Sequence, residues 1–175
     1  MEMSRKINVI LFEPEIHSNV GSIMRTCALT DVKLHLIEPF GFVFDKRNFA
    51  RSSANNFEGC EYVRYDDWTD FQEKNKNPKI FCLTRYGKKP ISDFDFKQTN
   101  DEIFLMFGKE STGIDKNILK QNKENCFRLP MVDIGRSLNI SNTVTVAVYE
   151  VLRQWDYLNL SKVEVEKGED YLDKL

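Results

Sequence analysis

Short apolar runs punctuate the chain, each bounded by charged residues, proline or glycine. Runs of this length are typical of buried β-strands. They predict strands over residues 7–12, 33–37, 61–65, 79–84, 103–107 and 126–129. After the first run, apolar residues from Val20 to Ala28 repeat at helical spacing, and Ser18 and Asn19 offer oxygens that can cap a helix. Shorter helices are predicted over residues 68–76 and 115–121.

The segment 141–155 carries two patterns at once. Val144, Val146 and Val148 favour a strand by propensity. However, Val144, Val148, Val151 and Trp155 also follow the spacing of one helix face. The segment is about 15 residues long without a break, and Ser141 can cap it, so we predict a helix.

Strands that alternate with helices predict an α/β domain with a mostly parallel sheet flanked by helices. In such sheets, ligands bind beyond the carboxyl ends of the strands. The loops after Thr84, Phe107 and Leu129 are therefore the places to search for a site. We expect one domain over residues 1–157 and an acidic C-terminal extension over 158–175, either a terminal helix or a solvated segment.

Composition excludes few functions. The 175 residues are 41% hydrophobic, as in an ordinary globular protein, and the net charge of −2 lacks the basic excess that many nucleic-acid binders show. No apolar stretch is long enough to span a bilayer, and the N-terminus does not resemble a signal peptide. We therefore expect a cytoplasmic protein with reduced cysteines. With two histidines and no C-x-x-C pair, no metal site is expected.

Three polar segments are candidates for chemistry. The loop 108–113 has phosphate-loop spacing but lacks the lysine that follows it in nucleotide triphosphatases, so it is either a tight turn near another ligand or a plain strand-to-helix turn. The string 135–142 is either a helix cap or the floor of a polar site. Arg25, six residues after Asn19, is either a surface arginine or an anion-binding group near a helix N-terminus.

Taken in order, these segments resemble a known family. The patterns N-x-G-x-I-x-R at 19–25, F-G-x-E-x-x-G at 107–113, and R-L-P-M followed by R-S-L-N-I-S-N-x-V at 128–144 resemble the three signature motifs of the SPOUT RNA methyltransferases. The strings at 10–16 and 37–42 resemble its small, single-domain subgroup, which methylates the ribose 2′-hydroxyl of the wobble pyrimidine of tRNA. The similarity covers about residues 7–157; the segment 51–57 departs from the subgroup pattern.

The resemblance implies a C-terminal deep trefoil knot, S-adenosylmethionine as cofactor, a homodimer, and the tRNA anticodon stem-loop as partner. It also implies two sets of residues. The cofactor-binding set is Leu83, Thr84, Gly108, Leu129, Met131 and Ser137. The catalytic set is Arg25, Asn19, Ser137, Glu110, Asn139, Arg136 and Tyr149.

Arg25 is the central member of the catalytic set. A guanidinium is too weak an acid to serve readily as a general base, because its pKa is above about 12. We therefore expect Arg25 to hold the target phosphate and to stabilise a developing 2′-alkoxide. Basic positions near the loops are expected to merge in a dimer into one RNA-binding surface: Lys46, Arg47, Arg51, Arg85, Lys88 and Lys89.

Three other readings compete with this one. Ribose methylation of ribosomal RNA or of another tRNA position is one, although such proteins commonly carry an extra N-terminal domain and the first strand here begins by Ile7. A knotted RNA-binding module that has lost catalysis is the second. The third is an unrelated flavodoxin-like nucleotide binder.

Overall fold

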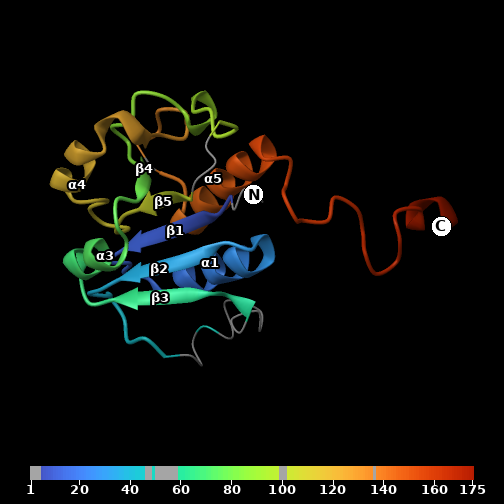
Figure 1. Cartoon of the computed structure of the whole chain (residues 1–175), viewed down its shortest axis with the longest axis horizontal. Coiled ribbons are helices and arrows are strands. Elements are labelled where there is room, and N and C mark those ends of the chain that lie inside the picture. Colours follow the sequence, from blue (N-terminus) through green and yellow to red (C-terminus); the bar gives the residue numbers. More distant parts are fainter. Residues whose placement is uncertain (1–4, 46–48, 50–58, 99–101, 136) are drawn as a thin grey trace.

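A computed structural model describes residues 5–45, 49, 59–98, 102–135 and 137–175 (Figure 1). Its centre is a six-stranded sheet in the order β3-β2-β1-β5-β4-β6, and every pairing among these strands is parallel. The strands are β1 Ile7–Phe12, β2 Lys33–Ile37, β3 Tyr62–Tyr65, β4 Lys79–Leu83, β5 Ile103–Phe107 and β6 Cys126–Phe127. The predicted α/β class is confirmed.

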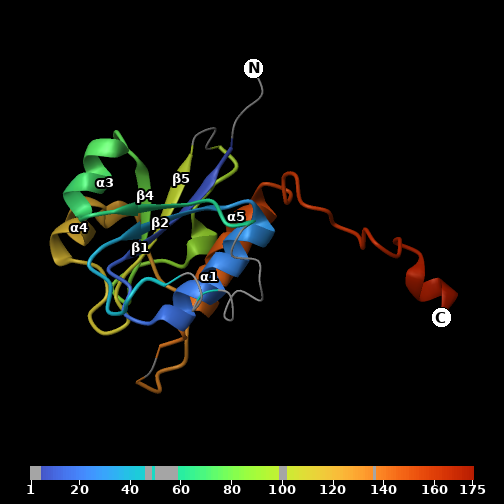
Figure 2. The ribbon, with the colours of Figure 1, turned by 90° about the horizontal axis from the view of Figure 1, so that it is seen from below.

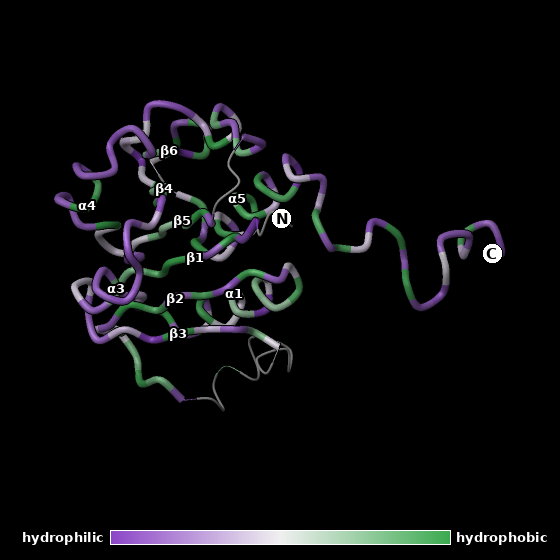
Figure 3. The backbone as a smooth tube through the Cα atoms, viewed as in Figure 1, coloured by the Kyte–Doolittle hydropathy of each residue, from purple (hydrophilic) through white to green (hydrophobic). Residues whose placement is uncertain are grey.

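Helices cover both faces of the sheet (Figure 2). α1 His17–Thr30 and α5 Ile140–Gln154 pack on one face, and α3 Trp68–Lys74 and α4 Lys116–Gln121 pack on the other. Successive side chains of a strand point to opposite faces, so alternate residues of β1 enter different cores. Val9 and Leu11 pack with α1 and α5, whereas Ile10 and Phe12 pack in the other core. Hydrophobic segments accordingly gather in the strands (Figure 3).

The ambiguous segment is a helix, as predicted, but both predicted caps are wrong. α1 begins at His17, and its N-cap Ile16 provides no side-chain bond, so Ser18 and Asn19 lie inside the first turn. The Asn19 side chain is instead bonded to a distant loop. α5 is capped by Asn139 rather than Ser141, because the Asn139 Oδ1 accepts from the backbone N–H of Ser141 at 2.8 Å.

Element ends differ from the sequence prediction by one or two residues. Thr84 follows β4 without belonging to it, although its N–H still donates to the carbonyl of Phe127 at 2.9 Å. β6 ends at Phe127 rather than at Leu129, and α3 ends at Lys74 rather than at residue 76. Two short 3₁₀ turns, Ile91–Asp93 and Lys123–Asn125, were not predicted.

The C-terminal segment leaves the body of the molecule (Figures 1 and 2). Tyr157 and Leu160 still pack against the core below α5. Beyond them the chain is almost wholly exposed and ends in one 3₁₀ turn, Tyr171–Lys174. Of the two forms expected for the extension, the structure shows the solvated segment and not a terminal helix. Within the described residues, none of the helices has both the length and the apolar character to cross a membrane.

Candidate active site at the carboxyl edge of the sheet

The carboxyl ends of β1, β5, β4 and β6 lie side by side, because these strands are neighbours in the sheet. Every strand is parallel, so the loops that follow them emerge at one edge. The first motif lies in α1, which follows β1, and the second and third motifs follow β5 and β6. The fold therefore brings to one edge segments that lie about 90 to 120 positions apart in the sequence.

The loops after β1 and β5 are joined by two carboxylates, each of which accepts hydrogen bonds from the other loop. The Glu110 Oε2 accepts from the backbone N–H of Glu15 at 2.9 Å. In return, the Glu15 carboxylate accepts from the backbone N–H and the hydroxyl of Ser111, both at 2.8 Å. We call this reciprocal set of bonds between Glu15, Glu110 and Ser111 the loop clasp. It fixes the loop after β1 against the loop after β5.

The loop clasp continues into the third motif through two asparagines. The Asn19 Nδ2 donates to the Glu110 Oε1 at 2.9 Å. The Asn139 Nδ2 donates to the Asn19 Oδ1 at 3.0 Å, while the Asn139 Oδ1 caps α5. Asn19 is largely buried, and a buried amide that lost these partners would carry a desolvation cost. The structure therefore joins Asn19, Glu110 and Asn139 in one network.

Charged side chains also join the loops after β1 and β5. An ion pair links the Lys109 Nζ to the Glu13 Oε2. The bonds from Ser111 lower the pKa of Glu15, with a smaller contribution from the charge of Lys109. The hydrogen bond to Glu13 raises the pKa of Lys109. Both groups are therefore held in their charged forms at neutral pH.

The two glycines of the 108–113 loop allow the tight turn of its backbone. A Cβ on Gly108 would lie 2.1 Å from the backbone carbon of Gly113, so no side chain fits there. Gly113 has φ of +76°, a conformation that favours glycine. Lys109 and Gly113 exchange two backbone hydrogen bonds that close the turn. These contacts show a closed turn, which both interpretations of the loop expect.

Arg25 and Tyr149 lie apart from this network. Both side chains are exposed, on the outer faces of α1 and α5. The two helices are tied together by a hydrogen bond of 3.1 Å between the hydroxyls of Thr26 and Thr145. Among the described residues, Arg25 has no hydrogen-bond or ion-pair partner. Its guanidinium is thus available to an anionic ligand.

The expected cofactor residues follow three adjacent strands. Leu83 ends β4 and Thr84 follows it, Gly108 follows β5, and Leu129 and Met131 follow β6. Leu129 is buried, Leu83 and Thr84 are half-buried, and Met131 is exposed, as is Ser137 in the segment before α5. This mixture of apolar side chains and loop backbone suits an adenine ring held by main-chain groups and flanked by aliphatic side chains.

Four predicted positions fall outside the described residues. They are Arg136 of the catalytic set and the basic positions Lys46, Arg47 and Arg51. The divergent segment 51–57 lies outside them too.

The sequence reasoning overlooked the partners that complete the network. Glu13, Glu15, Lys109 and Ser111 were not among the predicted site residues. A signal was available, because all four directly follow β1 or β5, two adjacent parallel strands with polar residues at the same edge. Polar residues that follow neighbouring strands are candidates to meet, although the pairing between them depends on loop geometry.

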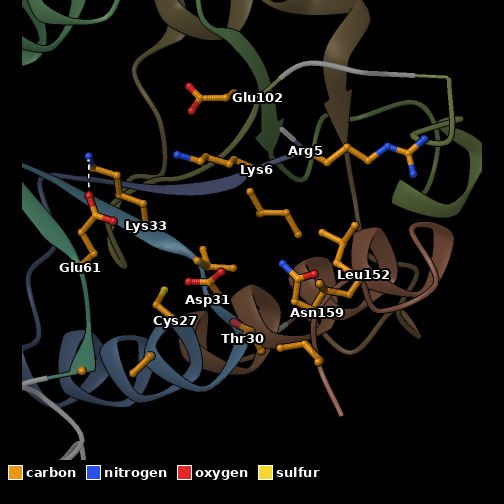
Figure 4. Close-up of a pocket in the computed structure, with 16 residues that line it drawn as sticks. Arg5, Lys6, Cys27, Thr30, Asp31, Lys33, Glu61, Glu102, Leu152 and Asn159 are labelled. Carbon is orange, nitrogen blue, oxygen red and sulfur yellow. Dashed lines mark ion pairs between the residues drawn. The ribbon is translucent and has the colours of Figure 1, made fainter. Parts of the chain in front are cut away.

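A cavity lies at the opposite, amino edge of the sheet (Figure 4). It has a volume of about 310 Å³ and is lined by residues that precede β1, β2 and β3, by the end of α1 and by Leu158–Leu160 of the extension. An ion pair of 2.7 Å between Lys33 and Glu61 lies at its rim. None of the predicted site residues lines this cavity. In the described ranges, no cluster of three or more metal-ligating side chains occurs.

Comparisons with known proteins agree with this geometry. A Geobacillus stearothermophilus protein provisionally named tRNA (cytidine(34)-2'-O)-methyltransferase is 41% identical over 155 residues, covering 89% of this chain and 99% of its own. The Escherichia coli (strain K12) protein tRNA (cytidine(34)-2'-O)-methyltransferase is 39% identical over 152 residues, covering 86% and 95%.

Solved structures share the fold. One from work on the 2-OH methylation of C/U34 on tRNA has a TM-score of 0.79 and 28% identity, covering 86% of this chain and 97% of that chain. The methyltransferase AviRb from Streptomyces viridochromogenes, in complex with the cofactor AdoMet, has a TM-score of 0.74 at 22% identity, covering 86% of this chain and 58% of that one.

Fold and site together define an RNA methyltransferase. The chain belongs to the SpoU rRNA Methylase family, whose model matches residues 6–149. The parallel sheet and its flanking helices fit this family, and the C-terminal knot stays an expectation from the resemblance.

Proposed function

We propose that this protein transfers a methyl group from S-adenosylmethionine to the ribose 2′-hydroxyl of the wobble nucleotide, cytidine or uridine, in the anticodon loop of tRNA. The observation that carries the proposal is the network of Asn19, Glu110 and Asn139, which joins all three motifs at the edge where ligands of parallel sheets bind. The relatives that match nearly the whole chain, and are named for this reaction, support it. Such a protein acts where tRNA is found, in the cytoplasm.

The cofactor supplies, when bound, an electrophilic methyl group on a sulfonium. The residues that would hold it lie at or after the ends of β4, β5 and β6 and in the segment before α5, namely Leu83, Thr84, Gly108, Leu129, Met131 and Ser137. Their contribution is to bind and orient it and to exclude water. Holding two reactants in line supplies a large share of the rate acceleration in such transfers.

The protein's own groups act on the ribose. Arg25 would hold the phosphate of the target nucleotide and stabilise negative charge at its 2′-oxygen, since its guanidinium is exposed and has no partner among the described residues. Asn19, Glu110 and Asn139 position the start of α5 and the segment before it, where Ser137 lies. Tyr149 and Arg136 complete the proposed catalytic set.

We also propose that the active form is a homodimer. The outer faces of α1 and α5 lie side by side and expose apolar residues, with Leu29 at 59% and Val146 at 48% of their full exposure. Arg25 and Tyr149 lie on the same two faces. A second copy that covers them would bury this apolar surface and complete the site around Arg25.

The assignment is tested by methylating a set of tRNA transcripts with labelled cofactor and mapping the modified nucleoside. Label in the 2′-O-methylated wobble nucleotide is expected. Label in ribosomal RNA, or at another tRNA position, would overturn the substrate proposal. Cofactor binding without any transfer would favour the inactive RNA-binding module.

Arg25 is tested separately with Arg25→Lys and Arg25→Ala, assayed for methyl transfer and for tRNA binding. We expect the alanine variant to lose transfer by at least about a hundredfold, the size typical for loss of a charge-stabilising group. The lysine variant should retain part of the RNA affinity, because it keeps the charge but loses the planar fork. Near-normal turnover in both variants would contradict the role of Arg25.

A further inference from the structure

The turn that follows β4 presents an exposed tyrosine beside the proposed cofactor residues. We call residues 84–89 together with Arg128 the Tyr86 turn. Tyr86 is 70% exposed, two residues beyond Thr84. An aromatic ring exposed beside a site is a candidate for contact with a ligand, because it offers an apolar face and a polar hydroxyl.

The turn holds Tyr86 in place. The N–H of Gly87 donates to the carbonyl of Thr84 at 3.1 Å, and the N–H of Tyr86 lies 3.3 Å from the Thr84 hydroxyl. A Cβ on Gly87 would lie 2.4 Å from the backbone carbon of Phe127, so the turn packs directly on β6. The N–H of Arg128 donates to the carbonyl of Lys89 at 3.1 Å and ties the far end of the turn.

The turn is also a local concentration of unpaired positive charge. Arg85, Lys88 and Arg128 are exposed, and none of them forms an ion pair with a described residue. The Arg85 guanidinium carbon lies 5.7 Å from the centre of the Tyr86 ring. Lys89 is engaged elsewhere, since its ammonium lies 3.9 Å from the centre of the Phe94 ring. The surface is therefore basic and aromatic in a chain whose net charge is −2.

We propose that the Tyr86 turn is a stacking platform for one unpaired base of the RNA substrate, with Arg85, Lys88 and Arg128 contacting the neighbouring phosphates. Loop bases of RNA expose their π-faces and stack on aromatic side chains and guanidinium planes. The platform lies beside the transfer site, so the base it holds belongs to the same loop as the target ribose. This inference rests on the proposed function and adds a substrate-contacting residue to it.

The experiment measures binding of an anticodon stem-loop RNA to the full-length protein and to three variants. Tyr86→Ala is expected to weaken binding about tenfold, the effect of losing one base stack, whereas Tyr86→Phe stays within about twofold because the ring remains. Tyr171→Ala is the matched control: it removes a tyrosine in the extension whose ring also lies near a cation, the Lys167 ammonium at 4.5 Å. It should leave binding unchanged.

A fluorescent purine, 2-aminopurine, placed in turn at each loop position reports stacking directly. One position should be quenched by the wild-type protein and by Tyr86→Phe but not by Tyr86→Ala. The contribution of charge is measured separately, from the salt dependence of RNA binding. Arg85→Ala should reduce this dependence by about one phosphate contact, whereas Tyr86→Ala should leave it unchanged.

The outcomes separate this inference from the proposed function. Normal methylation of the wobble nucleotide with equal RNA affinity for wild type and Tyr86→Ala would overturn the platform and leave the function standing. Methylation elsewhere, with weaker binding by Tyr86→Ala, would overturn the wobble assignment and leave the platform standing. A change in sedimentation of Tyr86→Ala without a change in RNA affinity would show a protein contact and overturn the platform.

Discussion

His35 shows how single side chains in this sheet are held in one protonation state. Asn75 donates to the Tyr65 hydroxyl at 3.2 Å, which leaves that hydroxyl to donate to the His35 Nδ1 at 2.8 Å. The His35 Nε2–H then donates to the Asn8 Oδ1 at 3.0 Å. This chain of donors fits the neutral ring. Burial, helped by the charge of Lys33, lowers the pKa of His35 to about 4.

Stability should therefore fall as pH falls from about 6.5 to about 4. In that window the unfolded chain binds a proton at His35 that the folded protein excludes, so the free energy of unfolding decreases by up to about 3 kcal/mol. Denaturant unfolding at pH 7.5, 5.5 and 4.5 measures this. His35→Gln should flatten the curve, whereas the same change at the exposed His17 should not. Parallel curves for wild type and His35→Gln would contradict the assignment.

The Glu110 carboxylate is the residue on which the site network depends most. It accepts from the Glu15 N–H and from Asn19, so both of its oxygens face donors. Glu110→Gln replaces one oxygen by a donor, and one of the two partners loses its bond. We expect a loss of about 1–3 kcal/mol in unfolding free energy and a larger loss of methyl transfer.

The control for this prediction is Glu38→Gln, which removes a half-exposed carboxylate paired with Arg64 at 2.6 Å. A surface pair of this kind contributes about 0–1 kcal/mol, so stability and transfer should change little. Equal effects of the two substitutions on both measurements would show that the loop clasp has no special role.

At the scale of elements, the turn after β4 depends on one glycine. Gly87→Ala places a Cβ against the backbone of Phe127, where no flexible side chain can give way. We expect a loss of about 1–3 kcal/mol in unfolding free energy, as in overpacked sites. Gly59→Ala is the matched control, since its Cβ would lie 3.7 Å from the Ala28 Cβ, an ordinary contact. A neutral Gly87→Ala would show that the turn moves freely.

The sequence predicted elements better than it predicted their ends. β1, β2 and β5 match their predicted ranges because buried parallel strands are continuous apolar runs with charged flanks. The cap of α5 was missed by two residues, because the Asn139 side chain and not that of Ser141 accepts the backbone bond at the helix start. The cap of α1 failed because the Asn19 side chain bonds to Glu110, 91 residues away. Local propensity cannot anticipate such partners. The motif resemblance singled out Asn19, Glu110 and Asn139, which the structure joins by hydrogen bonds, but the pairing of Glu15 with Ser111 needed the register of β1 against β5.

For the whole molecule, the carboxyl edge holds the candidate site and the amino edge holds the cavity and the start of the extension. Truncation after Leu160 removes five acidic and three basic side chains from an exposed segment. We expect unchanged stability, within about 0.5 kcal/mol. RNA binding should become tighter by about twofold at low salt, a difference that disappears at high salt.

Truncation after Tyr157 serves as the comparison. It also removes Leu160, which packs against the core, and Leu158, which lines the cavity. Thermal unfolding should then begin at a lower temperature. If both truncations behaved alike, the packing of Leu160 would contribute nothing to stability.

The loop clasp and the Asn19–Asn139 bond have a consequence for how activity appears during folding. They connect residues 91 to 120 positions apart, and such long loops close only after the chain between them has been ordered. A partly folded chain can hold most of its helices and strands and still lack the site. In refolding experiments, cofactor binding and methyl transfer should therefore recover later than the circular dichroism signal of the helices and strands. Their recovery would mark the moment when the distant segments have been joined.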